Sequence, residues 1–169
     1  ITSTLQGLGS FPGDDNQFLG MLGMHGTYEA NNAMHDCDLM INIGARFDDR
    51  ITGKIDEFSP KSKKVHIDID PSSINKNVKV DLAIVGDVKN VISSTLKSLK
   101  QKNSKFLKSN KQKTSKWWEK IQKWRSVRSL DYIGSEETIK PQYAIERLYE
   151  LTKDKDCLLY TSPSPRDLS

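Results

Sequence analysis

The chain has 169 residues, of which 36% are hydrophobic and 28% are charged, and its formal net charge is +4. That length allows one domain with additional elements. No apolar run approaches the roughly 18 residues of a membrane span, so we expect a soluble chain with no membrane partner. The first ten residues, ITSTLQGLGS, have neither a basic segment nor a long apolar segment, so we expect that they are not a signal peptide and that the chain starts within a domain. Cys37 and Cys157 stand alone, which excludes a disulfide framework and a cysteine-based metal site.

The positive charge is concentrated between Lys97 and Arg128, where Glu119 is the single acidic residue. Such a segment is typical of a nucleic-acid surface or of a solvated helix or linker. Since no nucleic-acid motif accompanies it, we favour the solvated interpretation and expect no nucleic-acid partner.

Alternating helical and apolar segments predict the fold class. A helix is expected over 27–35 with Thr27 as its N-cap, and another over 88–99 behind Asp87. Three apolar, β-branched runs are expected as buried parallel strands: Leu39 to Ile43, Val65 to Ile69 and Leu82 to Val85. This order predicts an α/β protein with a Rossmann-like open parallel sheet.

Each predicted strand is followed by polar residues at the end where such sheets bind ligands. The three segments are Gly44 to Arg50, Asp68 to Asp70, and Gly86 to Val88. Carboxylates at this edge suit ribose hydroxyls and an adenine amino group, and glycines let the backbone approach a pyrophosphate. A dinucleotide meets these requirements, although no G-x-G-x-x-G segment supports an ordinary NAD site. Each aspartate also has a purely structural interpretation, as a turn or helix cap.

The second half of the chain is more polar. Residues 100–113 predict an exposed linker or the frayed end of the preceding helix. Trp117, Trp118 and Trp124 have helical spacing, which favours an amphipathic helix docked on the domain over a base-stacking surface. Pro141 opens a further predicted helix, PQYAIERLYELTK, which we expect to begin a second domain.

Five motifs in fixed order resemble the large catalytic subunit of acetolactate synthase, a thiamine-diphosphate enzyme. They are TLQGLGSFPGDD, MLGMHGTYEAN, IGARFDDRITGK, VHIDIDPSSINKN and IVGDV. The resemblance implies that residues 1–100 belong to a central FAD-binding domain, 101–130 to a basic linker with a Trp-rich helix, and 131–155 to the start of the diphosphate-binding domain. Residues 156–169 depart from the family.

The resemblance also implies which residues contact the flavin. Carried over position by position, they are Thr4, Leu5, Gln6, Gly7, Leu22, Gly23, Met24, His25, Gly44, Ala45, Arg46, Phe47, Asp48, Asp68, Ile69, Asp87 and Val88. Asp49 and Arg50 match positions beside the substrate channel where inhibitors of the family bind. For His25, a satisfied helix-entry residue is favoured over a general base.

The family joins two pyruvates into 2-acetolactate, or pyruvate with 2-oxobutyrate, in the biosynthesis of valine, leucine and isoleucine. By resemblance, the full-length enzyme needs thiamine diphosphate and Mg²⁺, whose ligands lie outside this sequence, so we assign no catalytic or metal-binding residue here and expect an inactive piece. FAD has a chiefly structural role in the family. The resemblance further implies a homodimer or homotetramer, a small regulatory subunit, and a bacterial cytoplasmic or eukaryotic organellar location.

Two alternatives stay open at this level. The central domain of another thiamine-diphosphate carboligase or decarboxylase is one, and a basic nucleic-acid-binding module is the other.

The tail DCLLYTSPSPRDLS looks like translated sequencing-adapter DNA joined to a truncated reading frame, and a genuine terminus with a Ser-Pro phosphorylation site is its alternative. Its Ser-Pro repeats predict no contribution to a core.

Overall fold

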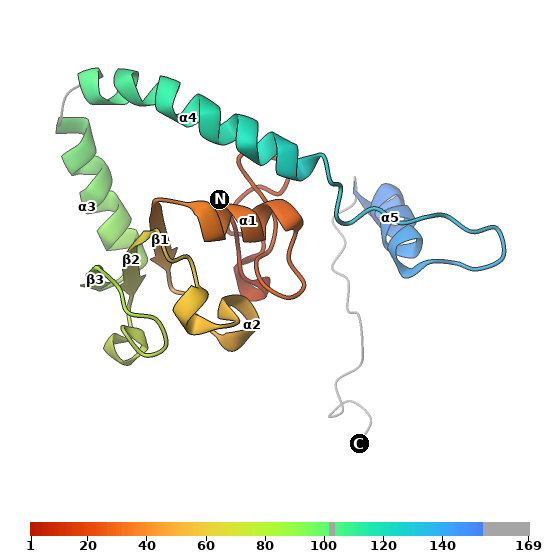
Figure 1. Cartoon of the computed structure of the whole chain (residues 1–169), viewed down its shortest axis with the longest axis horizontal. Helices are drawn as coiled ribbons and strands as arrows, with labels where there is room; N and C mark the ends of the chain where they lie inside the picture. Colours follow the sequence, from red (N-terminus) through yellow and green to blue (C-terminus); the bar gives the residue numbers. More distant parts are fainter. Residues whose placement is uncertain (102–103, 154–169) are drawn as a thin grey trace. The chain divides into compact units, whose positions relative to one another are not determined.

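The structure is a computed structural model, and its first part contains a three-stranded parallel sheet (Figure 1). It describes the backbone of residues 1–101 and 104–153 and the side chains of residues 1–100 and 114–153. The strands are β1 (Leu39–Ile43), β2 (Lys63–Asp68) and β3 (Leu82–Val85), in the order β1-β2-β3. Both pairs are parallel, which confirms the predicted open α/β sheet. The middle strand starts two residues earlier than predicted and leaves Ile69 outside.

One face of the sheet is packed along β1 and β2, whereas the other is buried at Ile67 of β2, which is 7% exposed, but open along β1. Met40 of β1 pairs with Lys64 of β2, and since register partners and every second residue lie on the same face, Met40 shares the packed face with His66. This face meets an apolar cluster built on Phe47, Phe58 and Val78.

The opposite face corrects the expectation of fully buried strands. The side chains that exceed 45% exposure there are those of Leu39, Ile41, Ile43 and Leu82. The prediction is wrong for β1 and β3, because an apolar run shows that a strand can be buried but supplies no layer to cover it.

The predicted helices are present with their predicted caps. Helix α1 (Tyr28–Asp36) begins after Thr27, whose side chain accepts a hydrogen bond from the backbone N–H of Ala30. Helix α3 (Val88–Gln101) contacts β2. The carboxylate of Asp87 accepts from the N–H of Asn90 in its first turn, at 3.1 Å. Short turns complete this part: η1 (Leu5–Gly7), α2 (Asp49–Thr52), η2 (Ile55–Glu57) and η3 (Pro71–Ser73).

Helix α4 (Ser104–Arg125) corrects the prediction of a linker. It is helical from residue 104. The side chains of residues 101–113 are not described, so the predicted exposure of that segment stays a prediction. Lysine and glutamine are good helix formers, and the segment has no Gly or Pro to stop a helix. A polar composition alone therefore did not distinguish a linker from a solvated helix.

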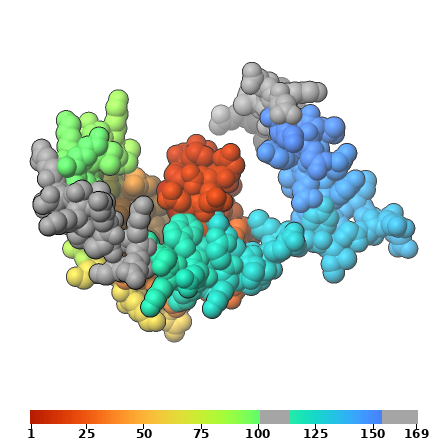
Figure 2. Space-filling model, turned by 90° about the horizontal axis from the view of Figure 1, so that it is seen from above, coloured from red at the N-terminus to blue at the C-terminus, as the bar shows by residue number. Residues whose placement is uncertain are grey.

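The tryptophans of α4 dock it onto α1, as predicted. Ile121 is 2% exposed in a core cluster with Leu19, Ala30 and Ala33, and Trp117, Trp118 and Trp124 pack against that cluster. The ammonium of Lys120 lies 2.6 Å from the carboxylate of Asp36. Arg125 donates to the carbonyl oxygens of Asn16 and Phe18, so the second half of α4 lies beside the N-terminal segment (Figure 2).

Two compact units follow from the pattern of contacts, Ile1–Ser129 and Leu130–Ser169. In the second unit, α5 (Pro141–Thr152) starts at Pro141 as predicted. The hydroxyl of Tyr132 donates to the carboxylate of Glu146 at 2.7 Å. The predicted domain limits stay predictions, and the tail 156–169 lies outside the described residues. Within the described ranges, no helix combines the length and apolar content of a membrane span.

Candidate functional site

The carboxyl ends of the three strands meet at one edge of the sheet. The N–H of Gly44, just after β1, donates to the carbonyl of Ile67 at 2.8 Å. The N–H of Gly86, just after β3, donates to the carbonyl of Asp68 at 2.9 Å. These bonds join the first residue after each outer strand to the end of β2, as the strand-end rule predicts.

A second, smaller ladder carries the two earlier predicted segments. Ser3 and Met21 form a parallel bridge, in which the N–H of Leu22 donates to the carbonyl of Ser3 at 3.1 Å. Thr4 to Gly7 and Leu22 to His25 therefore leave the same end of this ladder. The side chain of Thr4 caps η1 by accepting from the N–H of Gly7.

The turn at Gly23 joins this ladder to the sheet edge. The N–H of Met24 donates to the carbonyl of Arg50 at 3.0 Å. Gly23 has φ +90°, and a Cβ built there would overlap the carbonyl oxygen of Arg50. The turn before α1 and the turn after β1 thus hold each other directly, which the sequence did not reveal.

The predicted aspartates already have protein partners. Asp68 is 8% exposed, and its carboxylate accepts from the N–H of Asp70 at 2.9 Å. Its other oxygen lies 3.5 Å from Nε2 of the fully buried His66. Asp48 pairs with Arg46 at 3.0 Å. As described above, Asp87 caps α3, so the structural interpretation of these residues is correct alongside any binding role.

Asp70, rather than Asp68, caps the turn at Pro71. Its carboxylate accepts from the N–H and the hydroxyl of Ser72, both at 2.8 Å. The hydrogen bonds from Ser72 hold the pKa of Asp70 below its usual value. This leaves Asp68, just before it, as the aspartate directed toward the interior of the domain.

The open side of the edge has groups that suit a dinucleotide. Gly44 has φ +67° with no atom within 4 Å of a built Cβ, so a ligand can approach its backbone. The side chain of Arg46 is 68% exposed, and its guanidinium can pair with a phosphate. Exposed apolar side chains lie on the same segments, with Leu5 at 69% and Ile69 at 72%, and these suit the flat faces of aromatic rings. The backbone, the guanidinium and the apolar side chains on this edge together fit the phosphates and rings of FAD.

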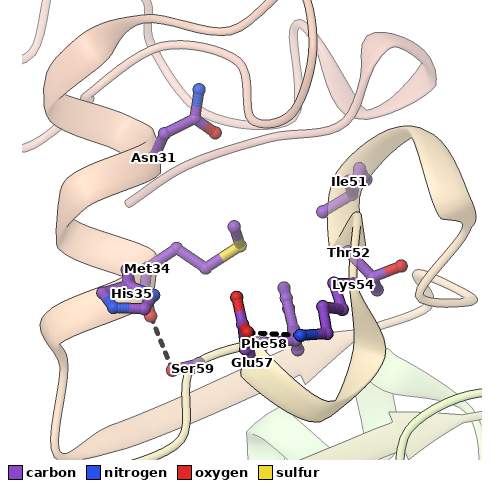
Figure 3. Close-up of a pocket in the computed structure, with 9 residues that line it drawn as sticks. All are labelled: Asn31, Met34, His35, Ile51, Thr52, Lys54, Glu57, Phe58 and Ser59. Carbon is purple, nitrogen blue, oxygen red and sulfur yellow. Dashed lines mark hydrogen bonds and ion pairs between the residues drawn. The ribbon is translucent and has the colours of Figure 1, made fainter.

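A separate hollow of about 310 Å³ lies between α1 and the segment of α2 and η2 (Figure 3). It is bordered by Met34 and Ile51, with Lys54 paired to Glu57 and the hydroxyl of Ser59 donating to the carbonyl of Met34 at 2.6 Å. None of the predicted site residues lines it. The candidate site is thus an open edge rather than this pocket.

Sequence reasoning missed the asparagines that support this edge. Asn31, Asn42 and Asn77 each bond to the backbone of a predicted binding segment. Asn42 lies two residues before Gly44, which is a local signal of a side-chain-stabilised turn. The other two contacts carry no such signal.

Comparison with known proteins agrees with the sequence motifs. The family described as "Thiamine pyrophosphate enzyme, central domain" matches residues 1–95. The acetolactate synthase large subunit of Haemophilus influenzae is 50% identical over 153 residues, which cover 90% of this chain and 26% of that protein. Acetolactate synthase isozyme 3 large subunit of Escherichia coli is 44% identical over the same shares. Acetolactate synthase 1, chloroplastic, of Zea mays is 44% identical over 90% of this chain and 23% of its own length.

The chain spans about a quarter of the length of these curated relatives. The match over 95 residues covers more than half of this chain, and the resemblance derived from the motifs is confirmed. The chain therefore belongs to the family of thiamine pyrophosphate enzymes, of which it carries the central domain.

Proposed function

We propose that the chain is part of an acetolactate synthase catalytic subunit, which condenses two pyruvates, or pyruvate and 2-oxobutyrate, in branched-chain amino-acid biosynthesis. Support comes from the similarity to bacterial and plant acetolactate synthases over nine-tenths of the chain. The family match supports thiamine diphosphate as a cofactor of the whole enzyme. Mg²⁺ is part of the same proposal, with its ligands outside this sequence.

Within that enzyme, we propose that this segment binds FAD along the strand-end edge. The observation that carries this proposal is the run of backbone hydrogen bonds that joins the separate predicted segments: Ser3 with Leu22, Met24 with Arg50, Gly44 with Ile67, and Asp68 with Gly86. Segments far apart in sequence thereby form one continuous edge.

The residues of this edge would contact different parts of the ligand, according to their chemistry. Arg46 would pair with the pyrophosphate, and Gly44 would let the backbone approach it. Asp48, which pairs with Arg46, would also accept a hydrogen bond from a ribose hydroxyl and so anchor the ribose. Leu5 and Ile69 would cover the flat rings. Their exposure in the structure supports each of these roles.

The reaction needs groups that this segment does not supply. In the whole enzyme, thiamine diphosphate would supply the carbanion stabilisation, and FAD would serve chiefly as a structural support. The residues of this chain bind and orient, and Asp49 and Arg50 would border the substrate channel. The exposed Asp49 side chain accepts from the N–H of Arg50, and the guanidinium of Arg50 contacts the sulfur of Met24, so the two exposed turns would form one wall of that channel.

Assembly and location are proposals of the same kind. We expect the full-length subunits to form a homodimer or homotetramer, with a small regulatory subunit, in a bacterial cytoplasm or a eukaryotic organelle. The exposed faces of β1 and β3 support burial of this segment within a larger protein.

A chimera tests the proposal. Residues 1–153 would replace the matching segment of the Haemophilus influenzae relative, and acetolactate formation from pyruvate would be measured with thiamine diphosphate, Mg²⁺ and FAD. We expect activity and retained flavin in the chimera, and no acetolactate from the 169-residue chain alone. A folded but inactive chimera beside an active parent would contradict the synthase assignment.

Flavin binding is tested separately in the same chimera. Asp68→Asn should weaken FAD binding, because it changes the charge at the end of β2, whereas Asp70→Asn should not, because Asp70 caps an exposed turn. An active chimera that neither retains nor binds FAD would leave the synthase assignment intact and refute the flavin assignment.

A further inference from the structure

Two asparagine side chains each form a pair of hydrogen bonds with the backbone N–H and carbonyl of a single residue in the strand-end edge. The amide of Asn31, which projects from α1 (Figure 3), accepts from the N–H of Gly23 at 2.8 Å and donates to its carbonyl at 2.9 Å. The amide of Asn42 donates to the carbonyl of Ala45 at 2.6 Å and accepts from its N–H at 3.3 Å. Each amide therefore occupies the place that the backbone of a neighbouring strand would take.

A third asparagine holds the next part of the same edge. The amide nitrogen of Asn77, in the connection from β2 to β3, lies 3.0 Å from the carbonyl of Phe47 and 3.4 Å from that of Arg46. The ring of Phe47 is 6% exposed and meets the rings of Phe58 and His66 edge to face. Phe47 is thus fixed through both its backbone and its side chain.

The three held segments share an unusual backbone conformation. Each contains a residue with positive φ: Gly23 at +90°, Gly44 at +67° and Phe47 at +54°. For Phe47 this conformation carries a strain cost, since its Cβ disfavours the left-handed region. Such a conformation persists only where the surroundings fix it, and strained positions of this kind concentrate at binding sites.

We propose that Asn31, Asn42 and Asn77 are positioning residues that hold the strand-end edge in its ligand-binding conformation before the cofactor arrives. The inference rests on the proposed FAD-binding function. None of the three needs to touch the flavin, because each acts through the backbone segment that it holds. Their contribution is to raise the fraction of the free protein that can bind.

The expected effect on affinity follows from that fraction. The apparent dissociation constant is the intrinsic one divided by the binding-competent fraction. Loss of one such amide pair, worth about a factor of ten in a local equilibrium, should raise the apparent Kd for FAD by up to about tenfold, with the full factor reached where the competent fraction is small. The affinity of the competent state itself should not change.

The test uses the chimera described above, freed of flavin, with FAD as the probe. The variants are Asn31→Ala, Asn42→Ala and Asn77→Ala, and the milder Asn31→Asp and Asn77→Ser serve if an alanine variant does not fold. We expect a higher apparent Kd for each alanine variant, by up to about tenfold. Amide hydrogen exchange over residues 43–48 should be faster in flavin-free Asn42 and Asn77 variants and should return to the parent rate with saturating FAD.

Two control variants separate positioning from general stability. Asn32→Ala removes an amide on the same helix whose hydrogen bond among the described residues is to the carbonyl of Tyr28, and it should leave the Kd unchanged. Ile121→Ala lowers stability in the core cluster of Leu19, Ala30 and Ala33 without removing a side-chain hydrogen bond to the edge. The comparison is made between variants with the same melting temperature. If the asparagine variants then lose no more affinity for FAD than Ile121→Ala does, the inference is overturned.

The outcomes distinguish the inference from the function on which it rests. A parent chimera that binds FAD while the asparagine variants bind equally well refutes the positioning role and leaves the flavin assignment standing. A parent chimera that does not bind FAD refutes the flavin assignment, and the inference falls with it.

Discussion

The interlocked turns predict that two glycines with the same backbone angle respond differently to alanine. Gly9 and Gly23 have φ +89° and +90°, but a Cβ at Gly9 meets nothing within 4 Å, whereas one at Gly23 would overlap the carbonyl of Arg50. Gly9→Ala should cost about 1–2 kcal/mol of unfolding free energy through backbone strain alone. Gly23→Ala should cost about 1–3 kcal/mol more, because the clash forces a backbone shift that also breaks the bond from Met24 N–H to Arg50.

Urea denaturation of the 169-residue chain measures this difference. With a slope of about 1–3 kcal/mol per M, the extra cost at Gly23 moves the midpoint lower by about 1 M relative to Gly9→Ala. Gly26→Ala supplies the complementary case, since its φ is not in the left-handed region but its Cβ would lie 2.6 Å from the carbonyl carbon of Leu22. Equal losses for Gly9→Ala and Gly23→Ala would show that the two turns do not interlock as described.

Three further predictions concern packing and charge. Ile121→Ala should cost about 2–5 kcal/mol in urea denaturation because it opens a cavity between α4 and α1, and a loss below 1 kcal/mol would contradict that docking. The hydrogen bond from Lys120 lowers the pKa of Asp36. The pair therefore stabilises the fold at pH values above the ordinary pKa of a carboxyl group, and this stability is lost as the pH falls through the folded-state pKa of Asp36. Lys120→Met should flatten the loss of stability between about pH 5 and 3. The hydrogen bond to Glu146 raises the pKa of Tyr132 to about 12, and Glu146→Gln should return it toward its ordinary value in an NMR titration; an unchanged pKa would exclude the bond.

The candidate site was predictable where its signals are local. Strand ends, glycine turns and family motifs are readable along the chain, so the edge segments Gly44 to Arg50, Asp68 to Asp70 and Gly86 to Val88 were predicted in advance. The asparagine contacts were not, because Asn31 reaches a turn eight residues away and Asn77 reaches Phe47 across 30 residues. Side-chain amides are common on surfaces, and nothing in their composition marks the ones that bond to a distant backbone.

The sequence by itself determined the elements whose causes lie within a few residues. The cap of α1 joins Thr27 to Ala30 and that of α3 joins Asp87 to Asn90, each over three positions. Only the tertiary structure decided how these elements pack, since Lys120 meets Asp36 across 84 residues. It likewise decided which sheet face is covered and that the turns at Gly23 and Arg50 interlock. The physical reason is that periodicity and capping encode local backbone geometry, whereas burial and close approach depend on which distant segments fill the space beside an element.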